Sequence, residues 1–181
     1  MVVQTGGNNV LQSYDILAVC PSNMRTFNYV CANADVDIIL VDYSRKIPFH
    51  MPKKAVDIAL KRGIRLEILY APTIKGKRAS GWFVDCVEQQ LDLRVGLCAD
   101  TTGRRCTFSG ATRTTEVTKG RMVIFSSGAD ESAYIRGPAD VRNLARVMGF
   151  PSQSLPKLLR ENVYAVLRHA GELLLLALAH T

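Results

Sequence analysis

The three histidines of the chain are the residues best suited to metal or acid–base chemistry, and they lie far apart. His50 follows Pro48 and Phe49, whereas His169 and His180 lie near the end of the chain. No HxH or HxxxH spacing is present, although a metal-dependent phosphoesterase needs clustered imidazole and carboxylate ligands to generate hydroxide from bound water. We therefore expect no metal site and no cofactor.

The other reactive groups also lack the partners that catalysis requires. Glu67 has Arg and Lys neighbours and is interpreted as an ion-pair partner. Ser126-Ser127-Gly128 could present a nucleophile or hold a phosphate, but it is not a GxSxG motif and no His–Asp pair accompanies it. Small residues there are expected to let the chain turn and approach a neighbouring element. The five cysteines form no CxxC pair, which indicates reduced thiols rather than a zinc site or disulfides.

The charge pattern indicates binding rather than catalysis. The net charge is +7 and the pI is near 9.3. Residues 45–78 contain ten Lys and Arg against two acids, and residues 104–146 contain eight against four. Such concentrated blocks are typical of a surface that follows the phosphates of a polyanion. The cations expected to make these contacts are Lys75, Arg104, Arg105, Lys119, Arg121, Arg136 and Arg142.

Four continuous apolar runs, each bounded by turn or polar residues, predict buried parallel strands. They are Asp15–Cys20, Val36–Val41, Ile64–Tyr70 and Arg121–Ser126. Helical periodicity between and after these runs predicts the helices that would connect them. The predicted helices are Pro52–Arg62, Thr107–Lys119, Pro138–Met148, Ser152–Arg160 and Asn162–Ala170, with Gly171 as a stop. Alternating strands and helices predict an α/β fold with a parallel sheet.

This arrangement assigns the candidate phosphate contacts to different ends of the sheet. Those that follow the third strand are expected at the carboxyl end, and two more flank a helix amino terminus, which favours phosphate. The pair before the fourth strand is expected at the opposite, amino-terminal end. Lys75, Arg104 and Arg105 are the residues that follow the third strand, and Arg136 and Arg142 are those that flank the helix amino terminus. Lys119 and Arg121 are the pair before the fourth strand.

Six strings in a fixed order resemble the thirty-kilodalton protein subunit family of ribonuclease P and ribonuclease MRP. The strings are YDILAVCP (14–21), ADVDIILVDYSRKIPFHM (34–51), RGIRLEILYAPTIK (62–75), GRRCTFSGA (103–111), KGRMVIFSSGA (119–129) and IRGPADVRNLARVMGF (135–150). The ordered series is far more specific than any single string. It extends from Tyr14 to about Gly171, excluding one internal block.

The resemblance implies a TIM-barrel-like fold of the polymerase-and-histidinol-phosphatase type. It implies a non-catalytic, RNA-binding protein that supports a catalytic RNA in removing the 5′ leader of precursor tRNA. The implied partners are that RNA, precursor tRNA and a ferredoxin-like protein subunit of the same particle. The implied location is the nucleus, largely the nucleolus. No membrane is expected, because the longest apolar run, Leu173–Ala179, is too short to span one.

The chain also departs from the family pattern. We expect residues 1–181 to form a single partial barrel domain, because the opening strands of the family would precede Tyr14. Residues 78–102 interrupt the pattern and are acidic within a basic neighbourhood, and we expect them to be an insertion. They are interpreted as a retained intron or gene-model error, although alternation from Leu91 to Leu97 also fits a lineage-specific strand.

Two alternative functions stay open at this point. A stand-alone metal-dependent phosphoesterase would hydrolyse a chromogenic phosphate ester with added manganese or zinc. A truncated product without a stable fold would leave sheet edges and apolar helix faces uncovered and would aggregate.

Overall fold

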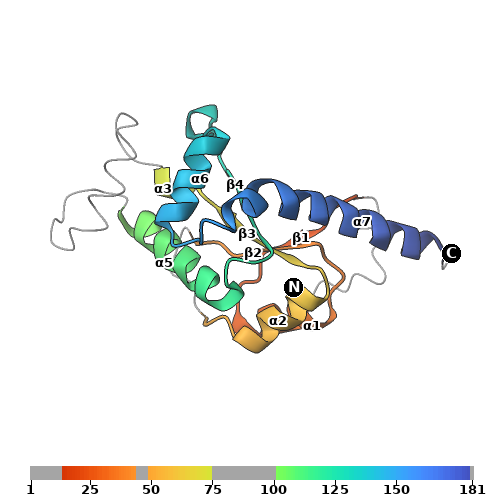
Figure 1. The fold of residues 1–181 in the computed structure, drawn as a ribbon. Helices are drawn as coiled ribbons and strands as arrows, with labels where there is room; N and C mark the ends of the chain where they lie inside the picture. Colours follow the sequence, from red (N-terminus) through yellow and green to blue (C-terminus); the bar gives the residue numbers. More distant parts are fainter. Residues whose placement is uncertain (1–13, 44–48, 75–100, 180–181) are drawn as a thin grey trace.

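The computed structural model describes residues 14–43, 49–74 and 101–179, which form a parallel sheet surrounded by helices (Figure 1). Lys75 lies outside the described residues. So does the predicted insertion at 78–102, except for its last two residues, which begin a helix. In the part of the chain that the structure describes, no helix is long and apolar enough to cross a membrane.

The described sheet has four parallel strands arranged in chain order, which confirms the predicted α/β class. The strands are β1 (Ala18–Val19), β2 (Ile38–Leu40), β3 (Arg65–Leu69) and β4 (Val123–Ser126). Each lies within a predicted run but is shorter than it. The register pairs Ile39 with Leu66 and Leu66 with Val123, so these three side chains share one face of the sheet.

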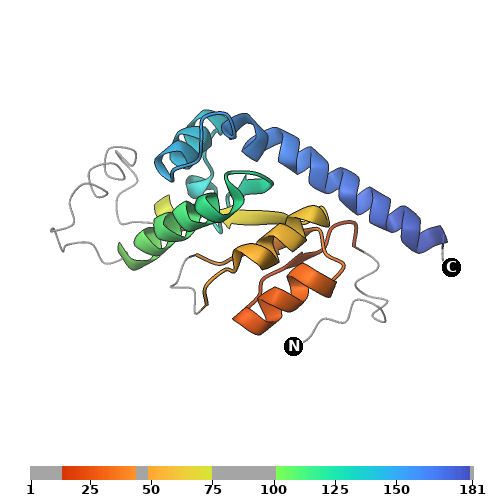
Figure 2. The same ribbon diagram turned by 60° about the horizontal axis from the view of Figure 1, so that its bottom comes forward.

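Three helices cover that face side by side (Figure 2). They are α1 (Met24–Asn33), α2 (Lys53–Lys61) and α5 (Thr101–Thr118). Phe27 of α1 and Val56 of α2 belong to the same fully buried cluster as Ile39 and Ile68 of the strands. The opposite face is less covered, because Ile38, Leu40, Glu67 and Leu69 are only half-buried.

Helix α1 was not among the helices predicted from the sequence. It begins at Asn23, whose side chain accepts a hydrogen bond from the backbone N–H of Thr26 at 2.8 Å. This is a standard amino-terminal cap. The first backbone N–H groups of a helix have no acceptor within the helix, and the Asn23 side chain provides an acceptor for one of them. The capping residue was therefore a usable sequence signal. The four-residue helix α3 (Ala71–Ile74) is too short for a periodic pattern to reveal.

Helix α5 begins six residues before the predicted start. Gly103 lies in its first turn, and the Thr107 hydroxyl donates to the Gly103 carbonyl at 2.8 Å. A threonine hydroxyl that bonds to the carbonyl four residues earlier in this way is compatible with a helix.

The carboxyl-terminal helices also differ from the prediction. After η3 (Ser132–Tyr134) and α6 (Pro138–Val147), a π-helical turn η4 (Lys157–Glu161) continues directly into α7 (Asn162–Ala179). The predicted helices Ser152–Arg160 and Asn162–Ala170 are thus one continuous helical segment that starts later. Gly171 does not end α7. The helix propensity of the Leu and Ala residues that follow it outweighs the unfavourable helix propensity of a single glycine.

Helix α7 passes along the amino-terminal ends of the strands. Asn162 donates to the carbonyl of Val123 at 2.6 Å, where β4 begins. Farther along α7, His169 Nδ1 lies 2.8 Å from the carboxylate of Asp37, which directly precedes β2. Two side chains seven residues apart therefore hold α7 against the starts of separate strands.

Candidate nucleic-acid interface

The carboxyl ends of β3 and β4 are joined closely and form the floor of the first group of candidate contacts. Tyr70 and Ala71 continue the pairing beyond the strand, through bonds to the carbonyls of Ser126 (3.1 Å) and Ser127 (2.9 Å). Gly128 has φ +57, and a Cβ there would lie 2.7 Å from Leu69 Cδ1. The expectation that small residues here permit a turn and a close approach is confirmed.

Among the described residues, the structure gives Glu67 a hydroxyl partner. The hydroxyl of Ser126 donates to Glu67 Oε1, and both side chains lie on the half-buried face of the sheet. Glu67 was expected to pair with a cation. Parallel pairing places Glu67 opposite Ile124 of β4. Ser126 lies two residues farther along β4 and therefore on the same face of the sheet as Glu67.

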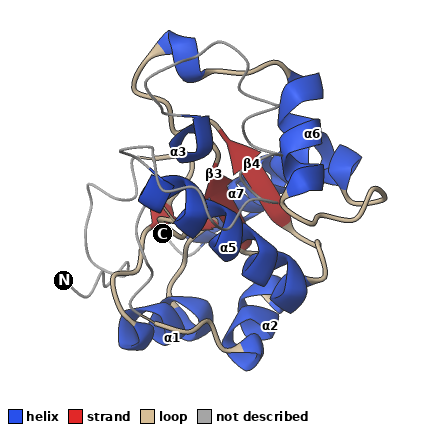
Figure 3. Cartoon of the chain, turned by 90° about the vertical axis from the view of Figure 1, so that its left-hand side faces the viewer, coloured by secondary structure: helices blue, strands red, loops and turns tan. Residues whose placement is uncertain are grey.

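Arg136 and Arg142 lie beyond β4 at the start of α6, among the elements that surround β3 and β4 (Figure 3). The backbone N–H of Arg136 donates to the Tyr70 hydroxyl at 3.1 Å, which fixes this segment against the end of β3. The Arg136 side chain is half-buried and already interacts within the chain. Arg142, one turn into α6, is exposed, so it is the member of this pair that solvent or a ligand can reach.

Arg104 and Arg105 lie in the first turn of α5, which is anchored nearby. The Thr107 hydroxyl reaches the Tyr43 carbonyl at 3.1 Å, and the Tyr43 hydroxyl is bonded to Thr114. Burial raises the pKa of Tyr43 to about 12, so this phenol is neutral and structural. Arg104 is half-buried and has an interaction within the chain, whereas Arg105 is exposed.

Lys119 and Arg121 flank Gly120 between α5 and β4, and both are exposed. They precede β4 and therefore lie at the amino-terminal end of the sheet, as the sequence predicted. The structure thus brings Arg104, Arg105, Arg136 and Arg142 to one end and leaves these two at the other. It does not describe Lys75.

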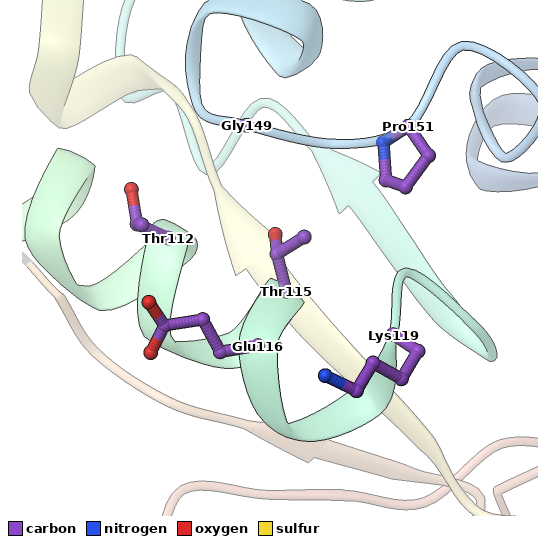
Figure 4. A pocket seen from close by; sticks show the side chains of 6 residues that line it. All are labelled: Thr112, Thr115, Glu116, Lys119, Gly149 and Pro151. Carbon is purple, nitrogen blue, oxygen red and sulfur yellow. The ribbon is translucent and has the colours of Figure 1, made fainter.

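A cavity of about 270 Å³ lies beside Lys119, between the second half of α5 and the chain that follows α6 (Figure 4). Its walls combine hydroxyl, carboxylate and ammonium groups with glycine and proline. The lining residues are Thr112, Thr115, Glu116, Lys119, Gly149 and Pro151. The threonine hydroxyls bond to carbonyls one turn earlier in α5, so the cavity offers few free donors for a small ligand.

The histidines have protein partners where the structure describes them. His50 lies 3.1 Å from Arg113, and His169 bonds to Asp37 and to the carbonyl of Arg62. Among the described residues, no group of three or more His, Cys, Asp or Glu side chains could hold a metal ion. The Asp37–His169 pair joins residues 132 positions apart, and no local sequence pattern could have revealed it.

Comparison with known proteins decides the family. The family model described as RNase P subunit p30 matches residues 2–173, nearly the whole chain. The chain belongs to the RNase P subunit p30 family. The assignment based on the ordered strings is therefore confirmed.

Curated relatives agree with the p30 assignment. "Ribonuclease P protein subunit p30" of Mus musculus is 31% identical over 86% of this chain and 49% of its own length. "Protein GAMETOPHYTE DEFECTIVE 1" of Arabidopsis thaliana is 33% identical over 81% of this chain and 21% of its own length. "Probable ribonuclease P protein subunit 3" of Schizosaccharomyces pombe is 26% identical over 90% of this chain and 59% of its own length. The chain spans between about a fifth and three fifths of these relatives.

Proposed function

We propose that this p30-family chain is a non-catalytic, RNA-binding protein subunit of ribonuclease P that supports 5′-leader removal from precursor tRNA. The observation that carries the proposal is the family match across residues 2–173, together with relatives named as ribonuclease P subunits in mouse and fission yeast. A role in ribonuclease MRP is proposed as well, since a relative in Saccharomyces cerevisiae is named "Ribonuclease P/MRP protein subunit RPP1".

The charges at the carboxyl end of the sheet support RNA binding. Arg105 on α5 and Arg142 on α6 are exposed there, while Arg104 and Arg136 are half-buried and engaged within the chain. A guanidinium can grip a phosphate through two parallel hydrogen bonds. We therefore assign direct phosphate contact to Arg105 and Arg142 and a supporting role to Arg104 and Arg136.

The wider arrangement is part of the same proposal. Strands in chain order, with α1, α2 and α5 along one face, are what a segment of a TIM-barrel-like fold would present. The half-buried second face would then face the barrel interior. We propose one such domain across residues 1–181, interrupted by an insertion at 78–102. The proposed partners are the catalytic RNA, precursor tRNA and a ferredoxin-like subunit, and the proposed location is the nucleolus.

Removing the two exposed arginines tests the RNA-binding role. Arg105→Ala with Arg142→Ala should weaken binding of the full chain to the catalytic RNA of its own ribonuclease P. It should also reduce the slope of log K against log salt by about 1.8, because each lost phosphate contact contributes roughly 0.9. Filter binding at several salt concentrations measures both quantities.

The matched control is Lys53→Ala with Lys54→Ala, an exposed pair in the first turn of α2 that removes the same charge outside the proposed contacts. The control should keep the parental slope. An equal slope for the arginine double variant and the parent would remove Arg105 and Arg142 from the interface.

A further inference from the structure

The turn between α5 and β4 has an unusual backbone conformation. Lys119 and Met122 have φ values of 56° and 57°, in the left-handed region that side chains with a Cβ seldom adopt, and Gly120 between them has φ 68°. Such conformations cost free energy and persist where the surroundings impose them, frequently at functional sites. Lys119 and Arg121 are the charged residues of this turn, and both are exposed.

A second segment holds the turn in place. A Cβ added to Gly120 would lie 2.9 Å from Ser154 Oγ and 3.0 Å from Pro151 Cδ, so only glycine allows the two segments to approach this closely. Within the turn, the backbone N–H of Gly120 donates to the Thr118 hydroxyl at 3.2 Å. The Lys119–Met122 turn is therefore packed against the chain that leads into η4.

That second segment carries its own distortion and its own pair of cations. The Ser154 carbonyl accepts bonds from the backbone N–H groups of Lys157 (3.0 Å) and Leu158 (3.1 Å), where η4 starts. Leu158 is fully buried, while Lys157 and Arg160 are exposed. A π-helical turn is rare and is commonly found at functional sites. Two distorted segments in contact thus present four exposed cations.

The chemistry of this surface favours a phosphate backbone over a protein partner. Ser152 and Gln153, between the cations, are exposed and offer a hydroxyl and an amide. Residues 119–122 and 151–161 contain no large apolar side chain that is exposed, and the exposed apolar side chains nearest to them in sequence, Val163, Tyr164 and Leu167, lie farther along α7. Protein interfaces have an apolar centre, whereas phosphate contacts use Lys, Arg, hydroxyl and amide groups. Shape and backbone contact of this kind suit double-helical RNA.

The surface lies away from the first one. Arg121 precedes β4 by two residues, and Asn162, which directly follows η4, bonds to the first residue of β4. Both segments therefore lie at the amino-terminal end of the sheet, whereas Arg105 and Arg142 lie at the carboxyl end.

We propose that the amino-terminal end carries a second RNA surface, formed by Lys119, Arg121, Lys157 and Arg160, which binds the backbone of an RNA helix separate from the one bound at the carboxyl end. The inference rests on the proposed RNA-binding function and adds to it that one chain bridges two RNA segments.

Counting bound duplexes tests the second surface. Native mass spectrometry of the full chain with excess RNA duplex of about 16 base pairs, a length that RNA-helix-binding domains can span, should show two duplexes per chain. Lys157→Ala with Arg160→Ala should bind one, and Arg105→Ala with Arg142→Ala should also bind one. Combining all four substitutions should abolish binding, and the control Lys53→Ala with Lys54→Ala should still bind two.

The outcomes separate this inference from the proposed function. A parent chain that binds a single duplex, or a Lys157/Arg160 double variant that still binds two, overturns the second surface and leaves the RNA-binding role standing. A parent chain that binds no duplex overturns both. All substituted side chains are exposed, and circular dichroism checks that each variant keeps the parental fold.

Discussion

At the scale of single residues, the Asp37–His169 pair is a largely buried polar contact between distant parts of the chain. Asp37 is 3% exposed, and its Oδ2 accepts the backbone N–H of Leu17 at 2.9 Å while its Oδ1 lies 2.8 Å from His169 Nδ1. His169 Nε2 lies 3.0 Å from the Arg62 carbonyl. Both ring nitrogens thus face oxygen atoms of the protein.

A double-mutant cycle should show that these two side chains are coupled. His169→Ala is expected to lower the free energy of unfolding by about 2 kcal/mol, because it leaves a buried carboxylate without one of its donors. The coupling energy with Asp37→Ala should be roughly 0.5–3 kcal/mol. Urea denaturation of the two single variants and the double variant measures it.

The neighbouring Asp35 provides the control. Its carboxylate lies 3.3 Å from Arg62 but is 71% exposed, and surface ion pairs contribute about 0–1 kcal/mol. Asp35→Ala should therefore change stability little. Additive effects of the Asp37 and His169 substitutions would contradict the role assigned to the pair.

At the scale of elements, glycines in two helices show why helix propensity alone does not describe this fold. Gly110 is buried in α5 against the ring of Tyr43, where an added Cβ would overlap the ring. Gly171 is exposed in α7, and an added Cβ would meet nothing within 4 Å. The same residue type therefore permits close packing in one helix and has no packing role in the other.

Alanine at these two positions should have opposite effects on stability. Gly171→Ala should raise the free energy of unfolding by about 0.5–1 kcal/mol, because alanine is the better helix former. Gly110→Ala should lower it by about 1–3 kcal/mol, because displacing Tyr43 costs more than the helix gains. Urea titrations of the two variants provide a matched comparison, and a stabilising Gly110→Ala would show that α5 does not pack on Tyr43 as described.

Several elements could be predicted from the sequence because their physical causes are local. Continuous apolar runs revealed the positions of β2, β3 and β4, and Pro138 together with Gly149 nearly bounded α6. Strand lengths were overestimated because apolar character continues into the flanking loops. The helix stop at Gly171 was wrong because a single unfavourable residue does not overcome the helix-forming run that follows it.

At the scale of the whole molecule, the contacts that assemble the site were beyond sequence reasoning because they join distant residues. The Arg136 backbone meets the Tyr70 hydroxyl, and Gly120 packs against Ser154, only after the chain has folded. The sequence did predict which end of the sheet Lys119 and Arg121 occupy, since strand direction in a parallel sheet determines it. It could not show that Arg104 and Arg136 are half-buried while Arg105 and Arg142 are exposed.

We propose that this chain works as an RNA-bound subunit of ribonuclease P. The most direct measurement is to tag the chain in its own cells, purify it and sequence the RNA that accompanies it. We expect enrichment of the catalytic RNA and cleavage of precursor tRNA at the 5′ leader by the purified material. Recovery of the tagged chain with neither that RNA nor that activity would contradict the claim while leaving membership of the p30 family intact.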